Sequence, residues 1–376
     1  MKLKRTAGTK PEAAATQLRV GQTHPFASLR SYLPLCGGEA RIYRELRESI
    51  PIIDAAIGKL VRLMGGFCVH CADAALEAKL AEFLRTVPCG RGQQGIGSFL
   101  SAYTDSLLTY GRAVGEMVML DGEFVALCWG DVTQVHIQEG DSPLDITLCA
   151  CDRQGTLRPL PYPHLLLLTT LNPEPANPYG VSLLRGMPFL ADILLKIYQT
   201  LGVNWERAGN VRYAVVCKPG ANGESAAGQV DAIASEWAAA MQDAKNGVVR
   251  DFVAVGDVSV KVIGADGQIL ESEVPVRQIL EQLVAKTGLP PFLLGLNWSS
   301  TERMSRQQAD LLTSEIWSLR RTVEPVLERI CTLWLQTQGC GRRPEIQWEE
   351  ISLQDLVEEA QAALYRAQAN ELLKEE

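Results

Sequence analysis

The chain has 376 residues, of which 47% are hydrophobic and 21% are charged, and its formal net charge at pH 7 is -8. This composition is that of a folded globular protein and excludes a largely disordered one. The negative charge argues against a protein that grips nucleic acid over a wide surface, because neutralising phosphates requires clustered Lys and Arg.

Targeting signals are not apparent in the sequence. Residues 11–30 lack the apolar stretch of a signal peptide. The longest aliphatic run, residues 165–168, is far shorter than the roughly 20 apolar residues that span a bilayer. Ten scattered cysteines fit reduced thiols better than a disulfide framework. We therefore expect a protein that starts in a cytoplasm and has no membrane contact.

The first half of the chain predicts an arm followed by an α+β region. Residues 1–38 mix Gly, Thr, Pro and Ala without a period, which predicts a mobile arm. Residues 40–63 space apolar side chains by three and four, which predicts a helix that Pro51 kinks or divides. Asp121-Gly122 is a hairpin signal. The other expected elements are a strand over 67–71, helices over 74–84 and 97–110, and strands over 114–120, 123–129, 132–138 and 146–151.

The middle of the chain predicts two helices around a small α/β module. A long helix is expected over 183–205, bent or restarted near its beginning by Pro188. A second helix over 274–286 should stop at Gly288, since Pro290 and Pro291 follow. Between them we expect a strand over 211–218, a helix over 228–244 and a strand pair over 248–262.

The last part of the chain predicts a loop and another long helix. A loop is expected over 294–300, and Ser299 with Glu302 forms a capping-box pattern at the next helix start. An apolar stripe from Leu312 to Trp334 marks that helix, which Pro325 should kink. A short strand over 345–348 and a charged helix from Ser352 onward complete the expected elements.

Two motifs with chemical meaning have simpler interpretations. Gly90-Arg-Gly-Gln-Gln-Gly95 matches a dinucleotide pattern, but a helix and Pro88 precede it where a strand is needed. We interpret it as a flexible interhelical loop. Cys68, Cys71 and Cys89 offer too few zinc ligands, and a strand directs Cys68 and Cys71 to opposite faces. We expect buried thiols, no metal and no cofactor.

No catalytic constellation emerges from the sequence. The four histidines lie outside any nucleophile-elbow or metal-binding helix pattern, and the acidic pairs stand at the ends of elements, where charges are usually solvated. We therefore expect a protein that is not an enzyme.

Three stretches resemble the portal proteins of long-tailed bacteriophages. Asn177-Pro-Tyr-Gly-Val-Ser-Leu-Leu-Arg185 looks like the entry into the family's first stem helix, and Thr287-Gly-Leu-Pro-Pro-Phe-Leu-Leu-Gly295 looks like the end of its second. Ser299-Ser-Thr-Glu302, followed by Gln307-Gln308 and Pro325, is similar to the helix after the channel loop. The similarity covers most of the chain from about residue 40.

The resemblance implies an α+β portal fold with an α/β wing, a two-helix stem, a small α/β clip, a long kinked helix and a short helical crown. The implied parts are an arm (1–38), a wing (39–180), stem helix 1 (181–209), a clip (210–269), stem helix 2 (270–289), a channel loop (290–301), a kinked wing helix (302–341) and a crown (342–376).

The resemblance also implies a function. A dodecameric ring at one capsid vertex would conduct double-stranded DNA during packaging and ejection, and would bind large terminase, major capsid protein and head-tail adaptor proteins. The protein would reside in the virion, and in the host cytoplasm during assembly. The candidate channel residues are Asn297, Trp298, Ser299 and Ser300. The candidate stem-packing residues are Leu190, Leu194, Ile197, Leu201, Trp205, Ile279 and Leu283.

Three alternatives stay open on the residues alone. The stem stripes could form an ordinary intramolecular helical core. The chain could be a cytoplasmic enzyme whose site is assembled from scattered Asp, Glu and Cys residues. It could also be the portal-like ring of a gene-transfer agent, which differs from a phage in its cargo.

Overall fold

The computed structural model describes residues 38–71, 73–142, 144–151, 156–175, 177–209, 212–217, 234–239, 242, 258–263, 272–296 and 302–351. The chain divides into two compact units. Unit 1 comprises Met1–Leu184 and Ala309–Glu376, and unit 2 comprises Arg185–Gln308. The predicted arm, apart from Gly38, and the predicted last helix lie outside the described residues.

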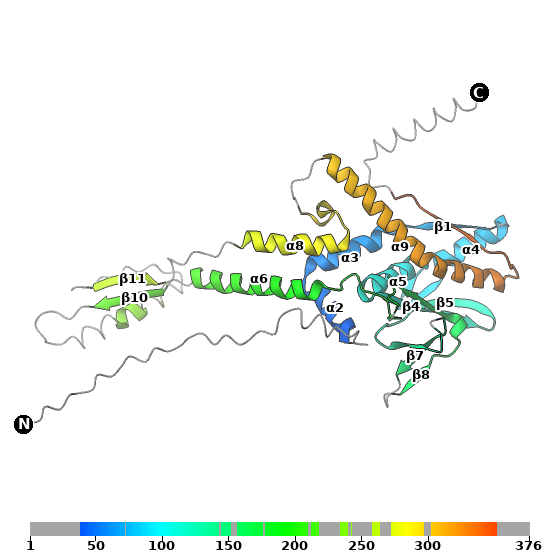
Figure 1. The fold of residues 1–376 in the computed structure, drawn as a ribbon, viewed down its shortest axis with the longest axis horizontal. Coiled ribbons are helices and arrows are strands. Elements are labelled where there is room, and N and C mark those ends of the chain that lie inside the picture. The colour runs from blue at the N-terminus through cyan, green and yellow to red at the C-terminus, as the bar shows by residue number, and fades with distance from the viewer. Residues whose placement is uncertain are drawn as a thin grey trace, which may run out of the picture. The chain divides into compact units, whose positions relative to one another are not determined.

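The first helices of unit 1 (Figure 1) begin and end close to the residues predicted from the sequence. Helix α2 (Gly38–Ser49) and helix α3 (Pro51–Leu63) replace the single predicted helix, because Pro51 occupies the first turn of α3, where its missing N–H costs nothing. The predicted division at Pro51 is confirmed. Asp73 caps helix α4 (Ala74–Thr86) by accepting from Ala75 N at 2.8 Å, and Gly111 ends helix α5 (Ile96–Tyr110) in a left-handed conformation.

Helix α9 (Glu302–Thr337) is one continuous helix that contains Pro325. Its ribbon changes direction part-way along its length (Figure 1). A proline inside a helix removes one backbone hydrogen bond and crowds the preceding turn, which accounts for a bend. Of the predicted apolar stripe, Leu319 is half-buried and the other members are buried: Leu312, Ile316, Val323, Leu327, Ile330 and Trp334.

Two three-stranded antiparallel sheets form the β part of unit 1. In the first, β4 (Arg112–Leu120) lies between β5 (Glu123–Trp129) and β9 (Leu166–Thr170). In the second, β7 (Ile146–Cys151) lies between β6 (Val135–Glu139) and β8 (Leu157–Pro159). A cluster of Val114, Val132, Ile137 and Leu148 joins the two sheets. The mixture of helix and sheet confirms the α+β class.

The strand predictions need three corrections. Strands β8 and β9 were not predicted, and a 3-10 turn, η1 (Pro163–Leu165), leads into β9. Strand β6 begins at Val135 and not at Val132, because the Asp131 carboxylate accepts hydrogen bonds from the amide and hydroxyl of Thr133 and holds a turn there. The Asp121-Gly122 turn between β4 and β5 is confirmed, and both residues have positive φ.

The glycine-rich motif forms a hairpin and not the predicted flexible loop. Strands β2 (Pro88–Gly90) and β3 (Gln93–Gln94) pair antiparallel across Arg91-Gly92, where φ is 48° and 76°. Two consecutive positive φ values are those of the turn that matches the twist of a tight hairpin. Gly95 then precedes α5. The prediction missed the hairpin because Arg91 is a residue that rarely adopts positive φ.

A two-stranded ribbon closes unit 1 from distant parts of the sequence. Strand β1 (Phe67–His70) pairs antiparallel with β12 (Glu345–Trp348), so that Phe67 lies opposite Trp348. The predicted strands at these positions are confirmed, the first ending one residue early.

A buried arginine, here called the Arg320 clamp, fastens this ribbon to α9. Arg320 is 1% exposed. Its Nε and Nη2 donate to the Met64 carbonyl at 2.9 and 2.7 Å, and its Nη1 donates to the Glu349 carbonyl at 2.6 Å. Its guanidinium also lies 5.0 Å from the ring centroids of Trp317 and Trp348. Burial lowers the pKa of Arg320.

Residues 177–184, here called the Gly180 corner, are held by hydrogen bonds against other parts of unit 1. Asn177 Nδ2 donates to the Gly180 carbonyl at 3.1 Å, and the Tyr179 hydroxyl pairs with both backbone groups of Ile137 at 3.2 Å. Gly180 and Gly111 both have positive φ, and their backbones are in close contact. Ser182 Oγ donates to the Thr109 carbonyl at 2.6 Å. The Asn-Pro-Tyr-Gly stretch therefore anchors the exit from unit 1 to the end of α5.

Unit 2 contains two paired helices and a strand pair. Helix α6 (Met187–Gly209) and helix α8 (Glu273–Thr287) lie side by side (Figure 1). Helix α6 begins at Met187, because Pro188 fits only the first turn of a helix. Strand β10 (Arg212–Cys217) pairs antiparallel with β11 (Val258–Ile263), and residues 234–239 are helical. None of the described helices has both the length and the hydrophobicity to span a membrane.

Candidate assembly surface

The predicted stem-packing residues divide by burial into three groups. Leu194, Ile279 and Leu283 are buried. Leu190, Ile197 and Leu201 are half-buried. Trp205 is 65% exposed. An intramolecular core therefore accounts for only part of the apolar periodicity of α6.

A second apolar face of α6 is exposed in the single chain. Leu195, Tyr198 and Trp205 are 41%, 46% and 65% exposed, and Gly202 lies between the last two. Their spacing of three, four and three residues places them along one line of the helix. We call this line the α6 stripe. A large apolar surface left open to water is a mark of an interaction site.

A polar line runs along the other side of α6. Asp192, Lys196 and Thr200 are spaced by four residues, and Lys196 Nζ donates to Asp192 Oδ2 at 2.6 Å. Phe189 and Val203 lie three residues before and after this line and are each 43% exposed, so exposed apolar side chains also occur on this side of α6. The sequence alone did not separate the α6 stripe from the more buried stem residues of α6, because the two sets lie next to each other on the helix.

The segment that leads to the predicted channel loop is tightly turned. Gly288 ends α8 in a left-handed conformation, which confirms the predicted stop. The Thr287 hydroxyl donates to the Val284 carbonyl at 2.7 Å and accepts from Leu289 N at 3.2 Å. The turn η2 (Pro291–Leu294) follows and ends at Gly295. Asn297, Trp298, Ser299 and Ser300, together with the predicted Ser299 cap, lie outside the described residues.

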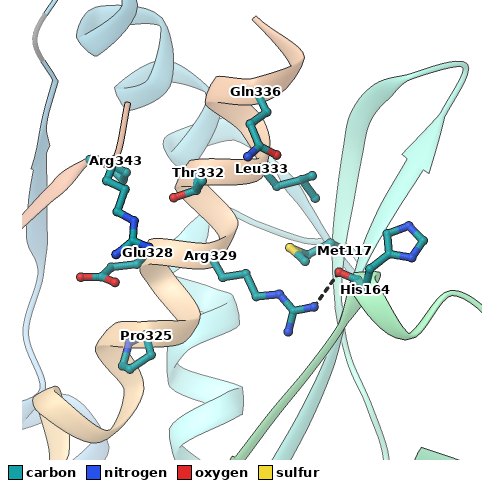
Figure 2. Close-up of a pocket in the computed structure, with 10 residues that line it drawn as sticks. Met117, His164, Pro325, Glu328, Arg329, Thr332, Leu333, Gln336 and Arg343 are labelled. Atoms are coloured by element: carbon teal, nitrogen blue, oxygen red, sulfur yellow. Dashed lines mark hydrogen bonds between the residues drawn. The ribbon is translucent and has the colours of Figure 1, made fainter. Parts of the chain in front are cut away.

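A cavity of about 500 Å³ in unit 1, lined by both polar and apolar residues, lies beside α9 (Figure 2). Arg329 donates to the backbone carbonyl of His164 at 2.6 Å, and the imidazole of His164 points away from the arginine. Glu328, Arg343 and Gln336 also line it. The cavity thus presents charged groups without a histidine ring placed among them as a general base.

The predicted buried thiols need one correction. Cys89 is buried and Cys71 is half-buried, but Cys68 is exposed. Strand β1 alternates, with Val69 buried and its neighbours Cys68 and His70 exposed. Among the described residues, no group of three His, Cys, Asp or Glu side chains is placed to hold a metal ion.

Burial and hydrogen bonds shift several other titratable groups. Hydrogen bonds to the side-chain oxygens of Gln347 and Glu77 raise the pKa of His70, and hydrogen bonds from the Cys71 amide and from His70 lower the pKa of Glu77. Burial raises the pKa of Tyr103, whose hydroxyl donates to Thr169 Oγ1 at 2.9 Å, and raises the pKa of Cys331 to about 12. Each group lies in a packing or strand-pairing contact, so these shifts indicate structure more than chemistry.

No protein-family model matches the chain, and no curated protein matches it. Solved structures do. A chain of the virion of a native gene transfer agent particle is 17% identical, with a TM-score of 0.65, covering 92% of this chain and 94% of that one. Chains of the necks of such particles, empty and native, computed with C6 and C12 symmetry, are each 16% identical over 86% of this chain and 87% of theirs, with TM-scores of 0.64 and 0.61.

A looser likeness is to an HK97-family phage portal protein from Corynebacterium diphtheriae, which is 14% identical with a TM-score of 0.45, covering 81% of this chain and 95% of that one. At these identities the first three matches establish a shared fold. The sequence resemblance is thereby confirmed at the level of fold, and the chain shares its fold with chains of the virion and the neck of gene transfer agent particles.

Proposed function

We propose that the chain is the subunit of a portal ring, which forms a passage for double-stranded DNA at one vertex of a phage-like particle. The carrying observation is the agreement in fold, over 92% of the chain, with a component of a gene transfer agent virion. The C12 symmetry of a related neck supports a ring of twelve copies. Such a ring needs neighbour contacts that are repeated head to tail, and the α6 stripe is a candidate for one of them.

The parts of the ring are assigned as the sequence resemblance implies. Residues 39–180 and 302–341 form the wing, 181–209 and 270–289 the stem, 210–269 the clip, 290–301 the channel loop, and 342–376 the crown. The clip binds large terminase during packaging and head-tail adaptor proteins afterwards, and the ring also contacts the major capsid protein. The protein resides in the virion, and in the host cytoplasm before assembly.

The proposed role is mechanical and requires no catalysis by this chain. DNA is moved by a separate ATP-driven terminase, so the ring has to hold its shape and let the duplex slide. A net charge of -8 on each subunit keeps attraction to phosphate low, since affinity for DNA rises with the number of Lys and Arg contacts. A predominantly basic channel wall would contradict this part of the proposal.

A gene transfer agent is favoured as the source of the particle over a phage by one observation. The three solved structures reported above with TM-scores above 0.6 all belong to gene transfer agent particles. The two candidates share the ring and differ in the DNA that passes through it. Sequencing the DNA in purified particles decides between them: host fragments indicate a gene transfer agent, and a single viral genome indicates a phage.

The ring itself is tested by native mass spectrometry of the purified full chain with negative-stain class averages. We expect a closed ring of about twelve subunits with a central hole, as in the C12 neck. A compact monomer that persists at high protein concentration would overturn the proposal.

The contribution of the α6 stripe is tested by introducing charge into it. In the variant Leu195→Glu/Tyr198→Glu we expect the ring to fall apart into subunits, because two carboxylates would be buried without partners in a subunit contact. Both positions are exposed in the single chain, so the circular dichroism spectrum of the subunit should not change.

The single variant Leu195→Glu is matched by the control Thr200→Glu, which adds the same one negative charge on the polar side of α6. We expect this control to form rings like the wild type. Rings in both variants would remove the α6 stripe from the interface, while the ring proposal itself would stand.

A further inference from the structure

Two cysteines from distant parts of the sequence share one cavity at the C-terminal end of α9. The cavity has a volume of about 310 Å³ and lies within unit 1. Cys71, directly after β1, and Cys340, three residues after the end of α9, both line it. The β1–β12 pairing explains their meeting, because His70 lies opposite Glu345 and so brings the segment that follows α9 against Cys71.

The backbone holds both cysteines in place. The amide of Cys71 donates to Glu77 Oε2 at 2.8 Å. Gly339 has a positive φ of 77° and donates to the Gln336 carbonyl at 3.0 Å, while Cys340 N donates to the Leu335 carbonyl at 2.9 Å. This is a Schellman ending, which fixes the residue after the glycine relative to the helix. Little conformational freedom is therefore left to lose if the two side chains join.

Both thiols are accessible from outside. Cys71 and Cys340 are half-buried and border the open cavity, whereas the nearby Cys331 is fully buried inside α9. Cys89 and Cys149 are also buried. A small oxidant can therefore reach Cys71 and Cys340 without unfolding of the chain.

We infer that Cys71 and Cys340 are a disulfide site, and that their oxidation cross-links the β1–β12 ribbon to the end of α9. We call this cross-link the staple. This inference does not depend on the proposed function. With a small-molecule disulfide as oxidant, one protein thiolate attacks the reagent, and the second protein thiolate displaces the remaining half. The protein gains one S–S bond and loses two protons and two electrons, and the reagent becomes two thiols.

The surroundings of Cys71 set the rate of this reaction. Burial raises the pKa of Cys71, and the nearby Glu77, Cys340 and Asp73 raise it further. Because the thiolate is the attacking species, stapling should be slow at neutral pH and should accelerate as the pH rises. A reducing cytoplasm keeps such thiols free, so we expect the staple in protein that has left that environment.

The test uses the full chain treated with glutathione disulfide at pH 8.5, blocked with an alkylating reagent and digested without reductant. We expect a cross-linked peptide that joins Cys71 to Cys340 and is lighter than the two separate peptides by two hydrogen atoms. We also expect an increase in Tm on the order of 5 °C that a reductant reverses.

Three variants serve as comparisons. Cys71→Ser and Cys340→Ser should each abolish the cross-link and the change in Tm. Cys68→Ser removes an exposed thiol from the same strand and should change neither. Glutathione adducts on Cys71 and Cys340 without a cross-link, or a link from Cys71 to Cys331, would overturn the assignment.

Discussion

Replacing Arg320 with alanine is expected to lower the free energy of unfolding by about 4 kcal/mol, because removing a buried charged donor leaves its partners unpaired. The guanidinium supplies three hydrogen bonds to the carbonyls of Met64 and Glu349. Both carbonyls face the clamp from segments next to β1 and β12, so the ribbon loses its attachment to α9. Urea denaturation followed by tryptophan fluorescence measures the change, since Trp317 and Trp348 lie next to the guanidinium.

Two further variants make the comparison specific. Arg320→Lys keeps the charge but cannot reproduce the fork of donors, so we expect it to recover less than half of the loss. Arg321→Ala removes an exposed arginine one residue away and should cost no more than about 0.5 kcal/mol. Equal losses for Arg320→Ala and Arg321→Ala would show that the clamp contributes no stability.

Replacing Gly180 with alanine is expected to cost about 3 kcal/mol or more, because it adds a steric clash to an unfavourable backbone conformation. A Cβ atom there would lie 2.4 Å from the Gly111 carbonyl oxygen and 2.8 Å from that of Leu171, and φ is 72°. Neither obstacle is the end of a flexible side chain. The two backbones would have to separate, which opens the corner where the chain leaves unit 1.

Gly186→Ala is the matched control for this substitution. Gly186 has a φ of 89° and no atom within 4 Å of an added Cβ, so only the backbone strain remains, at about 1 kcal/mol. Thermal denaturation of both variants separates the clash from the strain. A loss of Tm in Gly180→Ala no larger than in Gly186→Ala would mean that the corner adjusts without cost.

Local signals allowed much of the helical structure to be predicted. Pro51 and Gly288 mark a helix start and a helix end whose backbone requirements only a few residues meet, and both predictions are confirmed. Strands were harder, because pairing depends on partners far along the chain. The run Leu166–Thr170 is apolar without a clear period, so its pairing with β4 was not visible, although Leu167 proves to be buried.

The candidate site was predictable only in part. Periodicity placed Leu194 and Trp205 on one seam of one helix, yet Leu194 is buried and Trp205 is exposed. A period describes which residues share a side of a helix but not how far along the helix a partner extends. The Arg320 clamp was missed because an arginine inside an apolar stripe has no local signal. Its role follows only from the hydrogen bonds that it donates to the carbonyls of Met64 and Glu349, and Met64 is remote in sequence.

The order in which the ribosome makes the chain has a consequence for the β1–β12 ribbon. Glu349 accepts a hydrogen bond from Gly66, 283 positions earlier, and all of unit 2 is synthesised between them. Strand β1 therefore waits with an unpaired edge until translation has passed β12. A chain cut anywhere before α9 lacks both Arg320 and the partner strand, so truncated products should remain incompletely folded. Because β1 pairs only after β12 has been made, only complete chains fold fully. This would matter in any assembly that fails when one of its subunits is defective.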